Sequence, residues 1–175
     1  MDIHEYQAKI FLKKYNLPIP PFAHIKELSD IPLAIQHLNL TSGVLKVQVH
    51  AGGRGKAGGV IIAKTPDEIL KGAEKILKMK IVNNQTGKEG VIAHELLLSP
   101  LVNFEKEFYL GIIVDRKKAK AMLIASPEGG MDIEEIAHQF PEKIQAFPIE
   151  NRGVIRSYHL LEFIKFMGWN GKTAE

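Results

Sequence analysis

The chain has 175 residues, 45% hydrophobic and 25% charged, a composition typical of a globular protein with one domain or two small lobes. Its 23 basic and 20 acidic residues leave a net charge of +3, which does not favour nucleic acid or a membrane surface as a partner. The lack of cysteine excludes disulfides and thiolate catalysis. The N-terminus has no apolar signal core, and no apolar run approaches the roughly 20 residues of a membrane helix, so we expect a cytoplasmic protein.

The elements expected from hydrophobic periodicity alternate irregularly along the chain. Asp2 with Glu5, and Thr65 with Pro66 and Glu68, are typical of helix starts. The irregular alternation, and a hairpin expected around the basic turn RKKAK, favour an α+β fold of mixed α/β lobes over a doubly wound sheet. The pattern predicts helices at 2–16, 29–39, 65–80, 128–140 (after a turn, with Asp132 as cap) and 157–169, and strands at 43–50, 59–64, 91–98, 107–115 and 119–126.

A glycine-rich segment, HAGGRGKAGGV, joins the strands predicted at 43–50 and 59–64. Gly53, Gly55 and Gly58 satisfy the G-x-G-x-x-G spacing of dinucleotide-binding proteins, but that motif requires a helix immediately after the glycines. The residues that follow are β-branched, and the Walker A pattern cannot be drawn through the segment. A strand, a glycine loop and a second strand are instead the geometry of a flap over phosphates.

Basic side chains accompany the glycines. Arg54 can donate two hydrogen bonds to phosphate oxygens, Lys56 adds a charge, and Lys46 on the preceding strand shares its face with Gln48 and His50. The alternatives are a flexible hairpin with solvated charges, and RNA backbone binding, which the lack of interleaved aromatic residues disfavours. We expect His50 to be a hydrogen-bonded strand residue, and the spacing of the seven histidines indicates no metal site.

Four motifs together resemble one family. The sequence HEYQAK at 4–9, KVQVHAGGRGKAGGV at 46–60, KEFYLGIIVDR at 106–116 and ASPEGGMDIEEIA at 125–137 are similar to the beta subunit of succinyl-CoA synthetase. The resemblance extends over essentially the whole chain, and malate–CoA ligase beta subunits share its opening.

The resemblance implies an ATP-grasp fold in which two lobes hold the nucleotide. It places the first lobe, with the glycine flap, at 20–104, and an incomplete second lobe at 1–19 and 105–175. By matching position, Lys46 contacts the alpha- and beta-phosphates, and Glu107 binds the ribose. Ser99 stands where the family usually has an acid, which leaves the choice between adenine and guanine open. The full set of implied nucleotide-binding residues is Lys46, Gly53, Arg54, Gly55, Ser99, Val102 and Glu107.

The implied reaction is ATP-dependent formation of succinyl-CoA from succinate and CoA in the tricarboxylic acid cycle, through a phosphohistidine on an alpha subunit. The family's magnesium ligands and its C-terminal CoA-ligase domain are expected beyond Glu175, so we expect no catalytic residue and no metal ligand in this chain. ATP or ADP is the expected cofactor, GTP is possible, and Mg²⁺ is expected in the full-length enzyme. The alternatives are a malate–CoA ligase beta subunit and a truncated, non-catalytic nucleotide-binding or interaction remnant.

Three further features are interpreted as structural. The turn at Glu128-Gly129-Gly130, where Pro127 and Met131 depart from the family's usual residues, is expected to shape the chain rather than bind a ligand. The basic turn at 116–120 is expected to be a solvated hairpin tip. The aromatic set Tyr158, Phe163, Phe166 and Trp169 is expected to form the packed face of the last helix.

Overall fold

The structure, a computed structural model, describes residues 2–117, 119–130, 133–150 and 153–174. The chain divides into two compact units, Met1–Asn103 and Phe104–Glu175, and each is described by itself. Both units combine helices with antiparallel sheets, which confirms the predicted α+β class. Among the helices of these ranges, none is long and apolar enough to cross a membrane.

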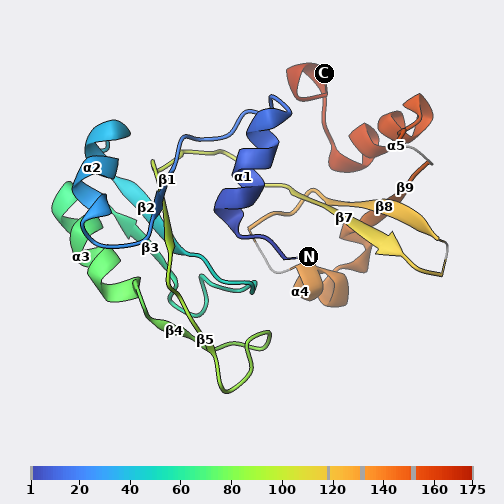
Figure 1. Cartoon of the computed structure of the whole chain (residues 1–175). Helices are drawn as coiled ribbons and strands as arrows, with labels where there is room; N and C mark the ends of the chain where they lie inside the picture. The colour runs from blue at the N-terminus through green and yellow to red at the C-terminus, as the bar shows by residue number, and fades with distance from the viewer. Residues whose placement is uncertain (1, 118, 131–132, 151–152, 175) are drawn as a thin grey trace. The chain divides into compact units, whose positions relative to one another are not determined.

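The first unit is built on a four-stranded antiparallel sheet. Its strands lie in the order β1 (Ala23–Ile25), β6 (Leu96–Ser99), β2 (Gly43–Val47) and β3 (Val60–Ala63). Two helices, α2 (Asp30–His37) and α3 (Pro66–Ile76), lie on one side of this sheet, and α1 (Glu5–Lys14) lies on the other (Figure 1). A small second sheet pairs β4 (Lys80–Ile81) with β5 (Val91–Ile92).

Strand β2 shows how the sequence orients the sheet. Leu45 and Val47 are fully buried in the hydrophobic core, and a Cβ added at Gly72 of α3 would come within 2.9 Å of the Leu45 Cδ1 atom. The helix therefore packs closely on this face. Because side chains alternate along a strand, Lys46 points to the opposite face, where α1 lies. The alternation predicted from the sequence positions this lysine correctly.

Helix α3 begins as its sequence predicts. The Thr65 side chain accepts a hydrogen bond from the Glu68 amide at 3.2 Å, and Pro66 is the first helical residue. The Glu68 carboxylate accepts from the Lys64 amide at 2.7 Å, one residue earlier than a capping box requires. The predicted end at residue 80 is wrong, because the helix stops at Ile76 and residue 80 pairs in β4. The strand predicted over 91–98 is two separate strands, β5 and β6.

The start predicted for the first helix is also wrong. The helix begins at Glu5 rather than Asp2, His4 is its N-cap, and the Gln7 side chain accepts a hydrogen bond from the His4 amide at 2.8 Å. Glu5 takes no part in capping because its carboxylate binds two basic side chains of the sheet and the glycine loop. A tertiary ion pair has overridden the local capping pattern.

The second unit is a three-stranded antiparallel sheet, with β7 (Tyr109–Asp115), β8 (Lys120–Ser126) and β9 (Gln145–Ile149) in that order. Helix α5 (Ser157–Met167) packs against β8 and β9. Helix α4 (Ile133–Gln139) and two short 3₁₀ turns, Pro141–Lys143 and Gly171–Thr173, complete the described elements. The predicted hairpin of β7 and β8 is confirmed, and the predicted cap Asp132 lies outside the described residues.

The aromatic face predicted for α5 is largely confirmed. The Phe147 ring of β9 packs edge-on against the Phe163 ring at 5.6 Å, and the Trp169 ring lies 5.1 Å from that of Phe163. Phe166 also reaches Phe147, at 6.2 Å. Tyr158 does not belong to this cluster, since it is 56% exposed. It occupies the first turn of the helix, where its ring lies 4.2 Å from that of His159.

Residues 1–19 fall within the first unit, whereas the lobe assignment made from the sequence groups them with 105–175. Helix α1 has no buried residue of its own, and polar contacts connect it to the sheet of the first unit. The assignment of 20–104 to one lobe and of 1–19 with 105–175 to the other stays a prediction.

Candidate functional site

The glycine loop connects β2 to β3. These strands pair antiparallel with Lys46 opposite Val60, so the predicted succession of strand, glycine loop and strand is present. Gly53 and Gly58 adopt φ values of +63° and +77°, a left-handed conformation that residues with a Cβ rarely take. The path of the loop therefore requires glycine at these two positions, whether or not a ligand is bound.

Two other glycines of the loop have opposite surroundings. A Cβ added at Gly59 would lie 2.5 Å from the Val47 Cγ2 atom, so this glycine allows the loop to close on the strand. A Cβ added at Gly55 would meet nothing within 4 Å. The loop is closed internally by a 2.8 Å hydrogen bond from the Gly59 amide to the Arg54 carbonyl. The loop is therefore tightly packed where it returns to the strand at Gly59, and it is open at Gly55.

A neighbouring turn holds the start of the loop. The Gly52 amide donates to the Gln85 side chain at 2.6 Å, and the Asn83 side chain donates to the Gly52 carbonyl at 2.9 Å. Asn83 also accepts from the amides of its own turn. Neither of these two amide side chains was predicted from the sequence to contact the loop. The turn-forming composition of NNQTG was a local signal for the turn, but not for its contact with the loop.

The two basic side chains predicted to hold phosphate meet on a single carboxylate. The Lys46 Nζ atom lies 3.1 Å from Glu5 Oε1, and the Arg54 Nη2 atom lies 2.7 Å from Glu5 Oε2. Arg54 Nη1 donates to the Val47 carbonyl at 2.9 Å, which fixes the guanidinium beside the strand. The structure thus brings Lys46 and Arg54 together and adds Glu5, which the sequence analysis had treated only as a helix-capping residue.

The charges of this cluster affect one another. Burial would raise the pKa of the Glu5 carboxyl, but the charges and hydrogen bonds of Lys46 and Arg54 outweigh it and hold that pKa below its ordinary value. Burial also lowers the pKa of Lys9, one turn along α1, with Glu5 acting to raise it and Lys46 to lower it. Lys9 is therefore a further basic group in the neighbourhood, which sequence spacing did not reveal.

Three contacts besides the ion pairs hold α1 at the site. The Tyr6 amide donates to the side chain of Gln48, which is only 3% exposed, at 3.1 Å. The rings of His4 and His50 stack 4.1 Å apart, and those of Tyr6 and His24 stack 3.8 Å apart. The expectation that His50 is a hydrogen-bonded strand residue is wrong, since it is exposed, lies beyond the end of β2 and stacks on His4.

A polar concavity of about 450 Å³ opens at this cluster. Glu5, Arg54 and Gly52 contribute to its lining, together with His50 and Gln85. Within the described ranges, no group of three or more acidic, histidine or cysteine side chains could hold a metal ion. Arg54 lines the concavity together with the carboxylates of Asp2 and Glu5, while Lys46 reaches Glu5 from the strand without lining it. With Glu5 moved aside, Arg54, Lys46 and the glycine loop could bind an anion here.

The remaining predicted residues lie elsewhere. Ser99 ends β6, is 7% exposed and pairs with Val44 of β2, one strand away from the lysine. Val102 follows the sheet and is 47% exposed. Glu107 belongs to the second unit, where a Cβ added at Gly130 would lie 2.5 Å from its Oε2 atom. The turn interpreted as structural therefore lies directly against Glu107.

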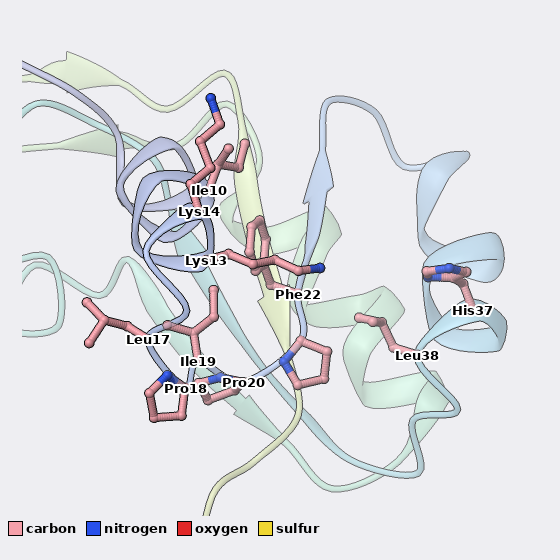
Figure 2. Close-up of a pocket in the computed structure, with 11 residues that line it drawn as sticks. Ile10, Lys13, Lys14, Leu17, Pro18, Ile19, Pro20, Phe22, His37 and Leu38 are labelled. Carbon is pink, nitrogen blue, oxygen red and sulfur yellow. The ribbon is translucent and has the colours of Figure 1, made fainter.

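A second hollow of the first unit is apolar and separate. It measures about 810 Å³ and shares no lining residue with the concavity at the glycine loop. Figure 2 shows it surrounded by side chains of α1, of the proline-rich segment that follows, and of the end of α2. Lys13 and Lys14 are its basic residues on α1, and His37 is the one on α2.

The chain is similar to known proteins over its whole described length. Residues 2–175 match the ATP-grasp domain family. Similar curated proteins include the ADP-forming succinate–CoA ligase beta subunits of Protochlamydia amoebophila, 48% identical over 175 residues, and Chlamydia felis, 45% identical over 175 residues. Each alignment takes in 100% of this chain and 45% of the relative, so the chain spans less than half the length of these proteins.

Solved structures show the same fold at lower identity. A crystal structure of a Pyrococcus horikoshii protein superposes with a TM-score of 0.68 at 20% identity, covering 93% of this chain and 63% of that one. A dinucleotide-forming acetyl-CoA synthetase of Candidatus Korarchaeum cryptofilum, solved in complex with coenzyme A, Ca-AMPCP and HgCl⁺, gives a TM-score of 0.67 at 16% identity. That alignment covers 94% of this chain and 66% of the synthetase chain.

Proposed function

This chain belongs to the ATP-grasp family, and from that premise we propose that it binds the phosphates of ATP or ADP with Lys46, Arg54 and the glycine loop. An ATP-grasp domain implies nucleotide binding, and the sequence corresponds to the ATP-grasp portion of ADP-forming succinate–CoA ligase beta subunits. The observation that carries the proposal is the convergence of Lys46 and Arg54 on the two oxygens of one carboxylate.

The carboxylate of Glu5 indicates what the two basic groups can hold. A phosphoryl group presents oxygen atoms that can likewise accept one hydrogen bond from an ammonium and another from a guanidinium. Gly55, with open space where a Cβ would be, lets the backbone approach such a group closely. The site therefore fits a phosphate chain better than it fits an uncharged ligand.

The rest of the nucleotide is assigned to three other residues. We place the base beside Ser99, which ends β6, and Val102, which follows it, and we place the ribose hydroxyls on the carboxylate of Glu107. The support for Glu107 is chemical, because a carboxylate can accept hydrogen bonds from both hydroxyls of a vicinal diol. The packing of Gly129 and Gly130 against Glu107 also supports it, since that packing fixes the position of this residue within the second unit.

For the complete protein we propose ligation of succinate and CoA with ATP cleavage, together with an alpha subunit whose histidine receives the phosphoryl group. The names of the relatives, ADP-forming succinate–CoA ligase beta subunits, support the ligation and a partner subunit, and the histidine is what the family resemblance implies. Magnesium would neutralise charge on the phosphates during transfer, but the described residues provide no ligand cluster for it, and we assign no step of this chain to the metal. The role that we propose for this chain is to bind and orient the phosphates and to shield them from water.

A thermal titration tests nucleotide binding. The purified chain is heated with increasing ADP, ATP or GTP, and its melting temperature is recorded. A nucleotide at 100 times its dissociation constant adds about 2.7 kcal/mol of stability, which raises the melting temperature by several degrees. A rise with ADP and ATP supports the proposal. A cooperatively folded chain whose melting temperature does not change with any of the three nucleotides would overturn it.

A reconstitution tests the wider reaction. The protein, in the form in which it is expressed, is combined with an alpha subunit and assayed for ATP-dependent acyl-CoA formation, with succinate and malate compared. Preferential turnover of succinate supports the assignment. Preferential turnover of malate would redirect it to malate–CoA ligation, and no turnover with either acid would favour a nucleotide-binding remnant.

A further inference from the structure

The carboxylate of Glu5 occupies the two groups that the proposed function assigns to phosphate. Each of its oxygens contacts one basic side chain, at 3.1 Å to Lys46 and 2.7 Å to Arg54. The three side chains are from one fifth to one third exposed, with values of 21% for Glu5, 22% for Arg54 and 34% for Lys46. The interaction is therefore partly shielded from water, and it is stronger than a fully exposed ion pair.

Two negative groups cannot share these cations without cost. A phosphate that approaches Lys46 and Arg54 has to replace the carboxylate or accept its charge only a few ångströms away. The helix that carries Glu5 does not have to leave for this exchange, because the Tyr6 amide and the stacked rings of His4 and Tyr6 hold α1 independently of the carboxylate. Rotation of one side chain is sufficient.

We propose that Glu5 is an internal anion that occupies Lys46 and Arg54 in the nucleotide-free chain and is displaced by the phosphates of the nucleotide, so that it weakens and thereby sets the nucleotide affinity. This inference rests on the proposed function of the same site. It assigns Glu5 a role opposite to that of a supporting residue. A supporting residue strengthens binding, whereas a competing anion weakens it, and the sign of the change on removing its charge distinguishes the two roles.

The test compares dissociation constants measured by calorimetry for ADP and for inorganic triphosphate. Glu5→Gln keeps the size of the side chain and removes its charge, and we expect both ligands to bind about tenfold more tightly than to the unaltered chain, the scale of one unscreened charge near the site. Glu74→Gln, at an exposed position on α3, makes the same change in net charge and is expected to leave both constants within about twofold.

A third variant keeps the inference testable if Glu5→Gln does not fold. Glu5→Asp keeps the charge but is one methylene shorter, so its carboxylate reaches the two cations less well, and we expect affinities between those of the unaltered chain and Glu5→Gln. Circular dichroism confirms that each variant is folded. If Glu5→Gln is unfolded, the inference is tested on Glu5→Asp alone, where tighter binding supports it and unchanged or weaker binding overturns it.

The outcomes separate the inference from the function on which it rests. Unchanged or weaker binding by a folded Glu5→Gln variant, with the unaltered chain still binding ADP, overturns the inference and leaves the proposed function standing. Failure of every form to bind either ADP or triphosphate overturns both. Tighter binding of triphosphate without any binding of ADP supports the competing anion and contradicts the nucleotide assignment.

Discussion

Replacing Lys46 with alanine should weaken nucleotide binding far more than it weakens the fold. The side chain is 34% exposed and forms a 3.1 Å ion pair with Glu5. Partly exposed pairs contribute about 1 kcal/mol or less, and the pairing of β2 with its neighbours uses the backbone rather than this side chain. The free energy of unfolding should therefore fall by no more than about 1 kcal/mol.

The effect on binding is expected to be larger. A hydrogen bond to a charged group is worth about 1.5–3 kcal/mol, so the dissociation constant for ADP should rise by about 10- to 150-fold in Lys46→Ala. Calorimetric titration measures it, with Lys71→Ala on the exposed side of α3 as the control for loss of a positive charge. A folded Lys46→Ala variant that binds ADP within twofold of the unaltered chain would refute the role of this lysine.

Three further predictions concern stability. Thr65→Ala removes the N-cap of α3 and should lower the free energy of unfolding by about 1 kcal/mol, as measured by urea denaturation. Gly129→Ala places a Cβ 2.5 Å from the Glu107 carbonyl carbon, and the forced shift should cost about 1–3 kcal/mol. Faster hydrogen exchange in the second unit would show this cost, and unchanged exchange would contradict the packing described here. Because the folded pKa of Glu5 is lowered, its charge stabilises the fold at neutral pH, and this contribution is lost as pH falls from 4.5 through the lower folded value. Urea denaturation should therefore show Glu5→Gln less stable than the unaltered chain at pH 7, with the difference shrinking in acid; a difference independent of pH would contradict the ion pairs.

Features set by neighbouring residues in the chain could be predicted from the sequence. The start of α3 depends on Thr65 and Pro66, and the hairpin of β7 and β8 depends on alternation around a short basic turn. The orientation of Lys46 follows from alternation along β2. Each of these features is local, so a pattern of a few residues determines it.

Features set by distant contacts could not be predicted. Glu5 meets Lys46 and Arg54 across 41 and 49 residues of sequence, and the pattern around Glu5 is equally compatible with a capping role. Strand β9 was not predicted. It contains Pro148, a residue type that disfavours strands, yet Pro148 pairs with Met122. In the described sheet β9 is an edge strand, where a missing backbone N–H is tolerated.

Hydrogen exchange with and without ATP would show whether the glycine loop binds the phosphates, because it reports which segment of the chain a nucleotide protects. We expect ATP to slow exchange in peptides covering residues 46–59, and we expect this protection to be smaller in Lys46→Ala. Protection confined to other segments, or none at saturating ATP, would contradict the assignment of the glycine loop and its two basic side chains to the phosphates.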